Sequence, residues 1–223
     1  RLNEGTTRHW TGSPNTIEGT VTVNGKEYVF MGDSGKREKI PQTTFYYDAL
    51  TTSYAFENDE ISLGLRFLSP LFPDNLEIMT RPVSYLMLSC TTADGSPAEI
   101  KISASEELCL NLRGEGTVAG GTVAFRGGKA VKMGNTDQKP LWRSGDNVRI
   151  DWGYFYLAAK GDADTSFIDG SDGMKYAVLK KTVKSGENAL IMFAYDDTES
   201  IEYFGKRLRS VWNSKGKTIE KAL

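Results

Sequence analysis

The feature that most constrains the fold of this chain is a long succession of short apolar and aromatic runs with a period of two. Runs such as TIEGTVTV (16–23), ISLGLRFL (61–68) and NALIMFAYDD (188–197) follow one another, with turn residues between them. Roughly fourteen such runs at a spacing of about 8–12 residues predict an all-β fold. We therefore expect a large antiparallel β-sandwich of the supersandwich kind.

The last part of the sequence shows a different pattern. Asp197 or Thr198 is a suitable helix cap, and large apolar residues follow at helical spacing. These residues are Ile201, Phe204, Leu208, Val211 and Trp212. A further helix is expected to begin after Thr218 and to continue to the end of the chain. The pattern predicts a sandwich domain over residues 1–197 and a helical segment over residues 198–223.

The composition excludes several classes of partner and site. The chain has 27 Lys and Arg against 29 Asp and Glu, for a net charge of −2, and the charges are not clustered. Nucleic acids and anionic membranes require a basic surface, so neither is expected as a partner. One histidine and two cysteines cannot form a multi-histidine zinc site or a four-cysteine cluster. We expect no metal and no cofactor.

Cys90 and Cys109 both lie in strand-like runs. A disulfide between them is possible, but two buried free thiols are the favoured interpretation, since free cysteine behaves as a small apolar residue.

The segment RHWTG (8–12) brings a cation, the sole histidine and an indole together. One interpretation makes Arg8, His9 and Trp10 a ligand surface or an interface anchor. The alternative is a strand end at which Trp10 packs and His9 has a structural role, because a lone histidine without a visible partner is weak evidence for chemistry.

The run RIDWGYFYLAA (149–159) contains Asp151 and Trp152, which are further candidates for an interface or ligand surface. If the run alternates as a strand, Trp152 lies on one face and Asp151 on the other, beside Phe155 and Leu157. An aspartate in such surroundings could have a raised pKa and act as a general acid. The favoured alternative is an ion pair between Asp151 and Arg149, two residues away on the same face.

Four long segments carry a resemblance to a known family. They are RHWTGSPNTIEGTVTVNGKEYVFMG, FLSPLFPDNLEIMTRPVSYL, SGDNVRIDWGYFYLA and AYDDTESIEYFGKRLRSVW. The sequence resembles the N-terminal β domain of the glutaminase A family, whose members are large secreted or periplasmic proteins of fungi and bacteria. The similarity extends from about Arg8 to Leu223.

The resemblance implies that the chain is a fragment of a longer, periplasmic or secreted protein. It also implies that a larger helical domain follows, to which hydrolysis of L-glutamine to glutamate and ammonia is attributed. We carry no catalytic residue of the family over to this sequence, and we expect the fragment to be inactive alone and to meet glutamine only through its parent. Its expected partner is that helical domain.

A different class of function remains open, namely a carbohydrate- or polymer-binding module. An exposed row of tryptophan and tyrosine would favour such a module. Buried tryptophans, together with an apolar patch near the C-terminal helix, would favour the supporting domain.

Overall fold

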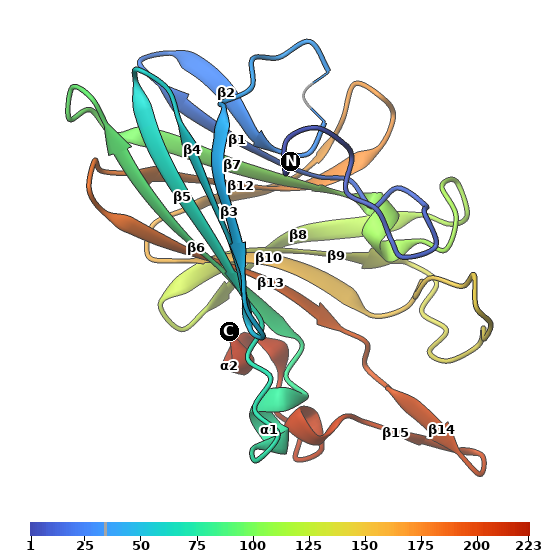
Figure 1. Ribbon diagram of the computed structural model, residues 1–223. Coiled ribbons are helices and arrows are strands. Elements are labelled where there is room, and N and C mark those ends of the chain that lie inside the picture. The colour runs from blue at the N-terminus through green and yellow to red at the C-terminus, as the bar shows by residue number, and fades with distance from the viewer. Residues whose placement is uncertain (34) are drawn as a thin grey trace.

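A computed structural model describes residues 1–33 and 35–223, and nearly half of them lie in antiparallel strands (Figure 1). The smaller sheet has five strands, in the spatial order β11 (Asp164–Asp169), β12 (Lys175–Val183), β7 (Ala98–Ser105), β1 (Ile17–Val23) and β2 (Lys26–Met31).

The larger sheet has eight strands. Their spatial order is β3 (Gln42–Tyr47), β4 (Thr51–Glu57), β5 (Ile61–Leu68), β6 (Val83–Thr92), β13 (Asn188–Asp196), β10 (Tyr154–Lys160), β9 (Gly128–Asn135) and β8 (Val118–Phe125). The inner faces of the two sheets share one hydrophobic core. The predicted antiparallel β-sandwich is therefore confirmed.

Alternation along the strands explains this core. In β5, Ile61, Leu63 and Leu65 are buried, whereas the residues between them face outward. Ile100 and Ile102 of β7 reach the same core from the other sheet. Side chains that alternate across a strand place every second residue on one face, so a period of two in the sequence becomes one apolar face in the sheet.

The turn between β1 and β2 follows directly from its sequence. Val23 pairs with Lys26, which leaves a two-residue loop of Asn24 and Gly25. Both loop residues have positive φ, 49° and 80°. Such turns match the twist of an antiparallel pair and favour Asn-Gly, so these two residues specify the hairpin.

A second hydrophobic cluster covers part of the outer face of the larger sheet. Strands β10 and β13 contribute Tyr156 and Met192 from the sheet, and Trp212, Ile219 and Leu223 come from the C-terminal segment. We call this the outer cluster. It explains why β10 is buried on both faces and reads as an almost continuous apolar run.

The helix predicted from the spacing of Ile201, Phe204, Leu208, Val211 and Trp212 is wrong. Residues 201–208 form a hairpin of β14 (Ile201–Tyr203) and β15 (Lys206–Leu208), in which Tyr203 pairs with Lys206. The loop residues Phe204 and Gly205 have φ of 46° and 73°, values that a right-handed helix cannot contain.

Helical structure is confined to short pieces. They are α1 (Leu76–Met79), η1 (Glu106–Cys109), η2 (Val211–Asn213) and α2 (Ile219–Ala222). The expected helix after Thr218 is thus confirmed as the single turn α2. Within residues 1–33 and 35–223, no helix is long and apolar enough to cross a membrane.

Cys90 and Cys109 are buried and free, so the favoured interpretation of two unpaired thiols is confirmed. Burial raises the pKa of the Cys109 thiol to about 12, and it raises that of Cys90 as well.

Candidate functional site

Three segments that are distant in the sequence meet through Arg149. Its Nη1 donates to the carbonyl oxygen of Pro14 at 2.9 Å and to Oδ1 of Asn15 at 3.0 Å. Its backbone N–H donates to Oδ1 of Asn111 at 3.1 Å. We call residues 8–15, 111–115 and 142–152 the loop cluster.

Asp151 is 4% exposed and lies at the centre of this cluster. Trp142 Nε1 donates to its Oδ1 at 3.0 Å, and Arg143 Nε lies 3.4 Å from its Oδ2. The guanidinium of Arg143 also lies 4.1 Å from the centre of the Trp142 ring and contacts Glu115 at 3.2 Å. The buried carboxylate is therefore held by an indole and a guanidinium.

The predicted ion pair between Asp151 and Arg149 is wrong: the carboxylate pairs with Arg143, and Arg149 binds backbone and amide oxygens. The prediction that residues 149–152 alternate as part of a strand is wrong, because β10 begins only at Tyr154. Gly153, with φ of 80°, turns the chain just before that strand, so residues 149–152 do not alternate between two faces.

Trp152 packs into the protein and is 5% exposed. Its carbonyl oxygen accepts a hydrogen bond from the Tyr195 hydroxyl at 2.8 Å. Its indole Nε1 has no partner among the described residues. Trp152 is therefore a core residue and offers no surface for stacking.

The segment Arg8–Trp10 lies on the surface of the loop cluster. Arg8 donates to the Gly12 carbonyl at 2.8 Å, and Nδ1 of His9 lies 3.0 Å from the Thr11 hydroxyl. Trp10 is 73% exposed, so the interpretation in which it packs at a strand end is wrong. Among the described residues, no hydrogen bond or ion pair joins Arg8, His9 or Trp10 to Asp151. The cluster thus brings these loops together without forming a nucleophile–base pair.

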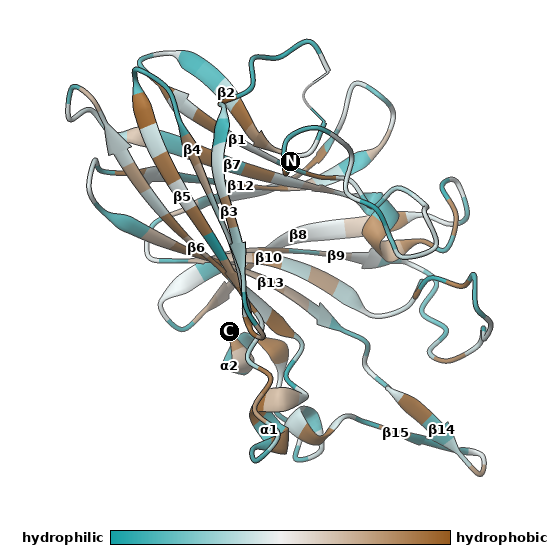
Figure 2. Ribbon diagram, viewed as in Figure 1, coloured by the Kyte–Doolittle hydropathy of each residue, from teal (hydrophilic) through white to brown (hydrophobic). Residues whose placement is uncertain are grey.

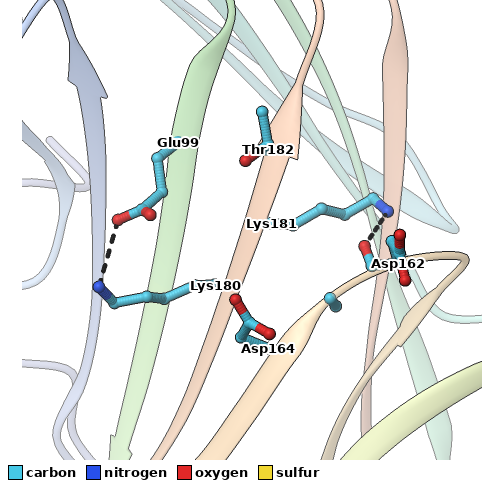
Figure 3. Close-up of a pocket in the computed structure, with 7 residues that line it drawn as sticks. Glu99, Asp162, Asp164, Lys180, Lys181 and Thr182 are labelled. Carbon is cyan, nitrogen blue, oxygen red and sulfur yellow. Dashed lines mark hydrogen bonds and ion pairs between the residues drawn. The ribbon is translucent and has the colours of Figure 1, made fainter.

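A polar cavity of about 300 Å³ lies along β7 and β12 (Figure 3). Its two lysines already have partners within the protein. Lys180 Nζ lies 3.4 Å from Glu99, and Lys181 Nζ donates to the carbonyl oxygens of Lys160 and Asp162 at 2.9 and 2.8 Å. Both lysines therefore have partners within the protein, and these contacts join β12 to its neighbours.

A third feature is an exposed apolar surface near the C-terminus, visible as brown segments on β14 and α1 (Figure 2). We call it the apolar end. Its members come from the α1 region and the β14–β15 hairpin and are Leu71, Phe72, Leu76, Met79, Ile201, Tyr203, Phe204, Leu208 and Val211.

Two contacts fix the C-terminal segment to the α1 region. The backbone N–H of Trp212 donates to the Thr80 hydroxyl at 3.2 Å, and Lys217 forms an ion pair with Glu77. The hairpin itself projects from the sandwich, and Phe204 at its tip is 89% exposed. Sequence reasoning missed this surface because the same apolar residues were assigned to a buried helix face. The glycine of the Phe204-Gly205 pair was the signal in the sequence that could have indicated a turn here.

Edge strand β3 carries exposed aromatic side chains: Phe45 and Tyr47 form a row on one face, and Tyr46 alternates to the other face. The Phe45 ring centre lies 5.7 Å from that of Tyr47 and 5.3 Å from that of Tyr54. The row is the second surface that sequence reasoning did not single out.

Comparison with known proteins places these features in a family. The family described as "Domain of unknown function (DUF5127)" matches residues 50–189, more than half of the chain. The chain belongs to this family. The match extends from β4 to the start of β13, so it includes two of the three segments of the loop cluster and excludes the β14–β15 hairpin.

A curated relative of this DUF5127 protein is Glutaminase A of Aspergillus oryzae. The two are 23% identical over 164 residues, which cover 73% of this chain and 24% of that protein. The chain thus spans about a quarter of the length of this relative. The similarity links the domain distantly to glutaminases.

Proposed function

We propose that this DUF5127 domain is a non-catalytic β-sandwich of a longer glutaminase-related protein, and that it supports a helical domain that follows Leu223 in the chain. The observation that carries the proposal is the apolar end. Its large apolar side chains are exposed on the α1 region and on the projecting hairpin, and exposed apolar side chains of this size are typical of surfaces to which something binds.

The position of the C-terminal segment in the fold is compatible with this partner. Leu223 packs against the outer cluster, on the outer face of the larger sheet. The segment just before it is tied to the α1 region through Lys217 and Glu77. A domain continuing from Leu223 would therefore begin beside the apolar end and could cover it without a long connection.

The chemistry of the loop cluster is consistent with a supporting role. Amide hydrolysis needs a nucleophile or an activated water together with groups that stabilise the oxyanion. Both Asp151 oxygens are engaged by Trp142 and Arg143, and His9 contacts Thr11. The hydrolysis of L-glutamine is accordingly assigned to the rest of the parent protein, which we propose to be periplasmic or secreted.

The proposal is tested by measuring ammonia release from L-glutamine. The 223-residue chain should show no turnover, and the full-length parent should be active. The parent that carries both Phe204→Asn and Leu76→Ser should lose stability or activity, because its contact between the two domains is weakened. The matched control is Lys206→Gln on the same hairpin. Turnover by the isolated chain near the rate of the parent would overturn the proposal.

The aromatic row of β3 favours a second candidate, a carbohydrate-binding module. Planar side chains at this spacing resemble a stacking surface, and Trp10 adds an exposed indole. The first candidate is preferred because Trp152 and Trp212 are buried and the apolar end is rich in aliphatic side chains. A saturable oligosaccharide titration that is abolished by Tyr47→Ala but unchanged by Thr43→Ala would establish the second candidate.

A further inference from the structure

A cavity of about 270 Å³ lies between the outer face of the larger sheet and the C-terminal segment. From the sheet it is lined by Lys132, Tyr154 and Asp196, and from the C-terminal segment by Arg209, Asn213 and Glu220, among others. The cavity exists only because residues 209–220 pass over the sheet.

Two polar atoms at this cavity have no partner. Asn213 is 5% exposed, and its Oδ1 accepts no hydrogen bond among the described residues. The Thr198 hydroxyl, which also belongs to a lining residue, is buried and unpartnered as well. Unpaired buried polar atoms cost free energy, so each should be satisfied by something that enters the cavity. An amide oxygen can only accept, so the entering group must carry N–H or O–H donors.

The cavity also holds two cations that lack a carboxylate partner. Lys132 Nζ lies 3.7 Å from the centre of the Tyr154 ring, and the described contacts include no ion pair for it. Arg209 likewise forms no ion pair or hydrogen bond with any described residue. Two such cations facing one cavity favour an anionic group, above all a carboxylate.

Negative charge lies in the same cavity. Asp196 accepts from the backbone N–H of Thr198 at 3.0 Å and keeps its other oxygen for a further donor. Glu220 lies close to Tyr156, and burial together with the charges of Glu220 and Asp196 raises the pKa of that phenol. Groups of both signs therefore face one small volume, and a ligand that satisfies them must itself carry both charges.

We propose that this cavity binds a free α-amino acid. Its α-carboxylate would lie between Lys132 and Arg209, and its ammonium group would donate to Asn213 Oδ1 and to Asp196. A zwitterion can pair with both the unpaired cations and the unpaired acceptor. An anion can pair only with the cations, and a cation only with the acceptor. The inference goes beyond the supporting role and does not depend on it, since the site belongs to this chain alone.

The test is calorimetric titration and thermal melting of the 223-residue chain with L-glutamine as the probe. Two analogues each lack one charge: glutaramate has no ammonium group, and γ-aminobutyramide has no α-carboxylate. L-glutamine should bind saturably and raise the melting temperature, and each analogue should bind at least about tenfold more weakly.

Two variants with matched controls locate the site. Lys132→Gln and Arg209→Gln should each weaken L-glutamine binding by about tenfold or more. Lys129→Gln on the same strand and Lys206→Gln on the hairpin lie outside the cavity and should leave binding unchanged. Arg209 is exposed, so its replacement does not endanger the fold.

Three results would overturn the inference. The first is absence of L-glutamine binding at millimolar concentration. The second is equal binding of glutaramate, which would indicate a simple anion site. The third is unchanged binding in both Lys132→Gln and Arg209→Gln, with circular dichroism showing that the variants are folded.

Discussion

The Arg149 guanidinium donates to the Pro14 carbonyl oxygen at 2.9 Å, although 135 positions of sequence separate the two residues. The same side chain reaches Asn15, and its backbone is bound by Asn111. One buried cation thus satisfies oxygens from two loops that no strand pairing holds together. Its hydrogen bonds therefore join the three segments of the loop cluster.

Replacing Arg149 by Met should lower the free energy of unfolding by about 2–3 kcal/mol, because buried oxygens lose charge-assisted hydrogen bonds. Urea denaturation measures the change. Lys129→Met, at an exposed position, is the matched control and should change stability by less than about 0.5 kcal/mol. A similarly small effect of Arg149→Met would show that the loops hold their positions without it.

Asp151 should be replaceable by Asn at a smaller cost than by Ala. Asn keeps an acceptor for Trp142 Nε1, whereas Ala leaves that donor without a partner and leaves Arg143 with Glu115 as its one ion-pair partner among the described residues. We expect Asp151→Ala to cost about 1–3 kcal/mol and Asp151→Asn clearly less. The fluorescence of Trp142 should also shift in Asp151→Ala. Equal costs for the two variants would contradict the role of the hydrogen bond.

The two thiols should be inert in the folded protein. Burial raises the pKa of Cys109 to about 12 and also raises that of Cys90, and only the thiolate reacts rapidly. A disulfide reagent at pH 8 should modify neither residue in the native protein and both residues in denaturant. Rapid labelling under native conditions would require that β6 or the η1 region opens readily.

The carboxyl group of Asp197 should make stability depend on pH. Burial, with a contribution from Asp196, raises its pKa above the ordinary value of 3.8. The unfolded chain therefore loses the proton at lower pH than the folded protein does. The stabilisation is complete below pH 3.8 and is lost as the pH rises through the folded pKa.

Asp197→Asn removes this dependence. The variant should melt at a higher temperature than the wild type at pH 7, and the difference should vanish below about pH 3.8. Asp169→Asn, at an exposed position in β11, is the control and should show no such trend. A lower melting temperature for Asp197→Asn at pH 7 would mean that the carboxylate is stabilising.

The apolar end should contribute little to the stability of the isolated chain. Phe204→Asn combined with Tyr203→Thr should reduce binding of a hydrophobic dye and leave the melting temperature unchanged, because these side chains are exposed. Asn also suits the positive φ of position 204. A clear fall in melting temperature would show that the hairpin packs against the sandwich in solution.

The sandwich was predictable because its evidence is local. Alternation in β5 and the Asn24-Gly25 turn each specify their own structure, and repetition of such signals defines the class. The Ile201–Trp212 segment misled because apolar residues at helical spacing can also occur in a hairpin. The positive φ angles of Phe204 and Gly205 are compatible with the hairpin and not with a helix.

The loop cluster could not be predicted from local pattern. Arg149 and Asp151 are two positions apart and looked like partners, but Arg149 binds oxygens on two other loops, and Asp151 is bound by Trp142 and Arg143 from earlier in its own segment. Arg143 reaches Asp151 because the chain folds back before β10, and Arg149 is drawn toward Pro14 by backbone oxygens. Such pairings depend on how distant loops pack, which a single sequence does not encode in its periodicity.

The position of β13 governs the order in which the protein can assemble. This strand pairs with β6 on one side and with β10 on the other, and it is made after both. Until residue 196 has left the ribosome, β6 and β10 each present an open edge, and open edges recruit strands from other chains. The larger sheet must therefore close late, and synthesis that stalls before residue 188 should yield an aggregation-prone nascent chain.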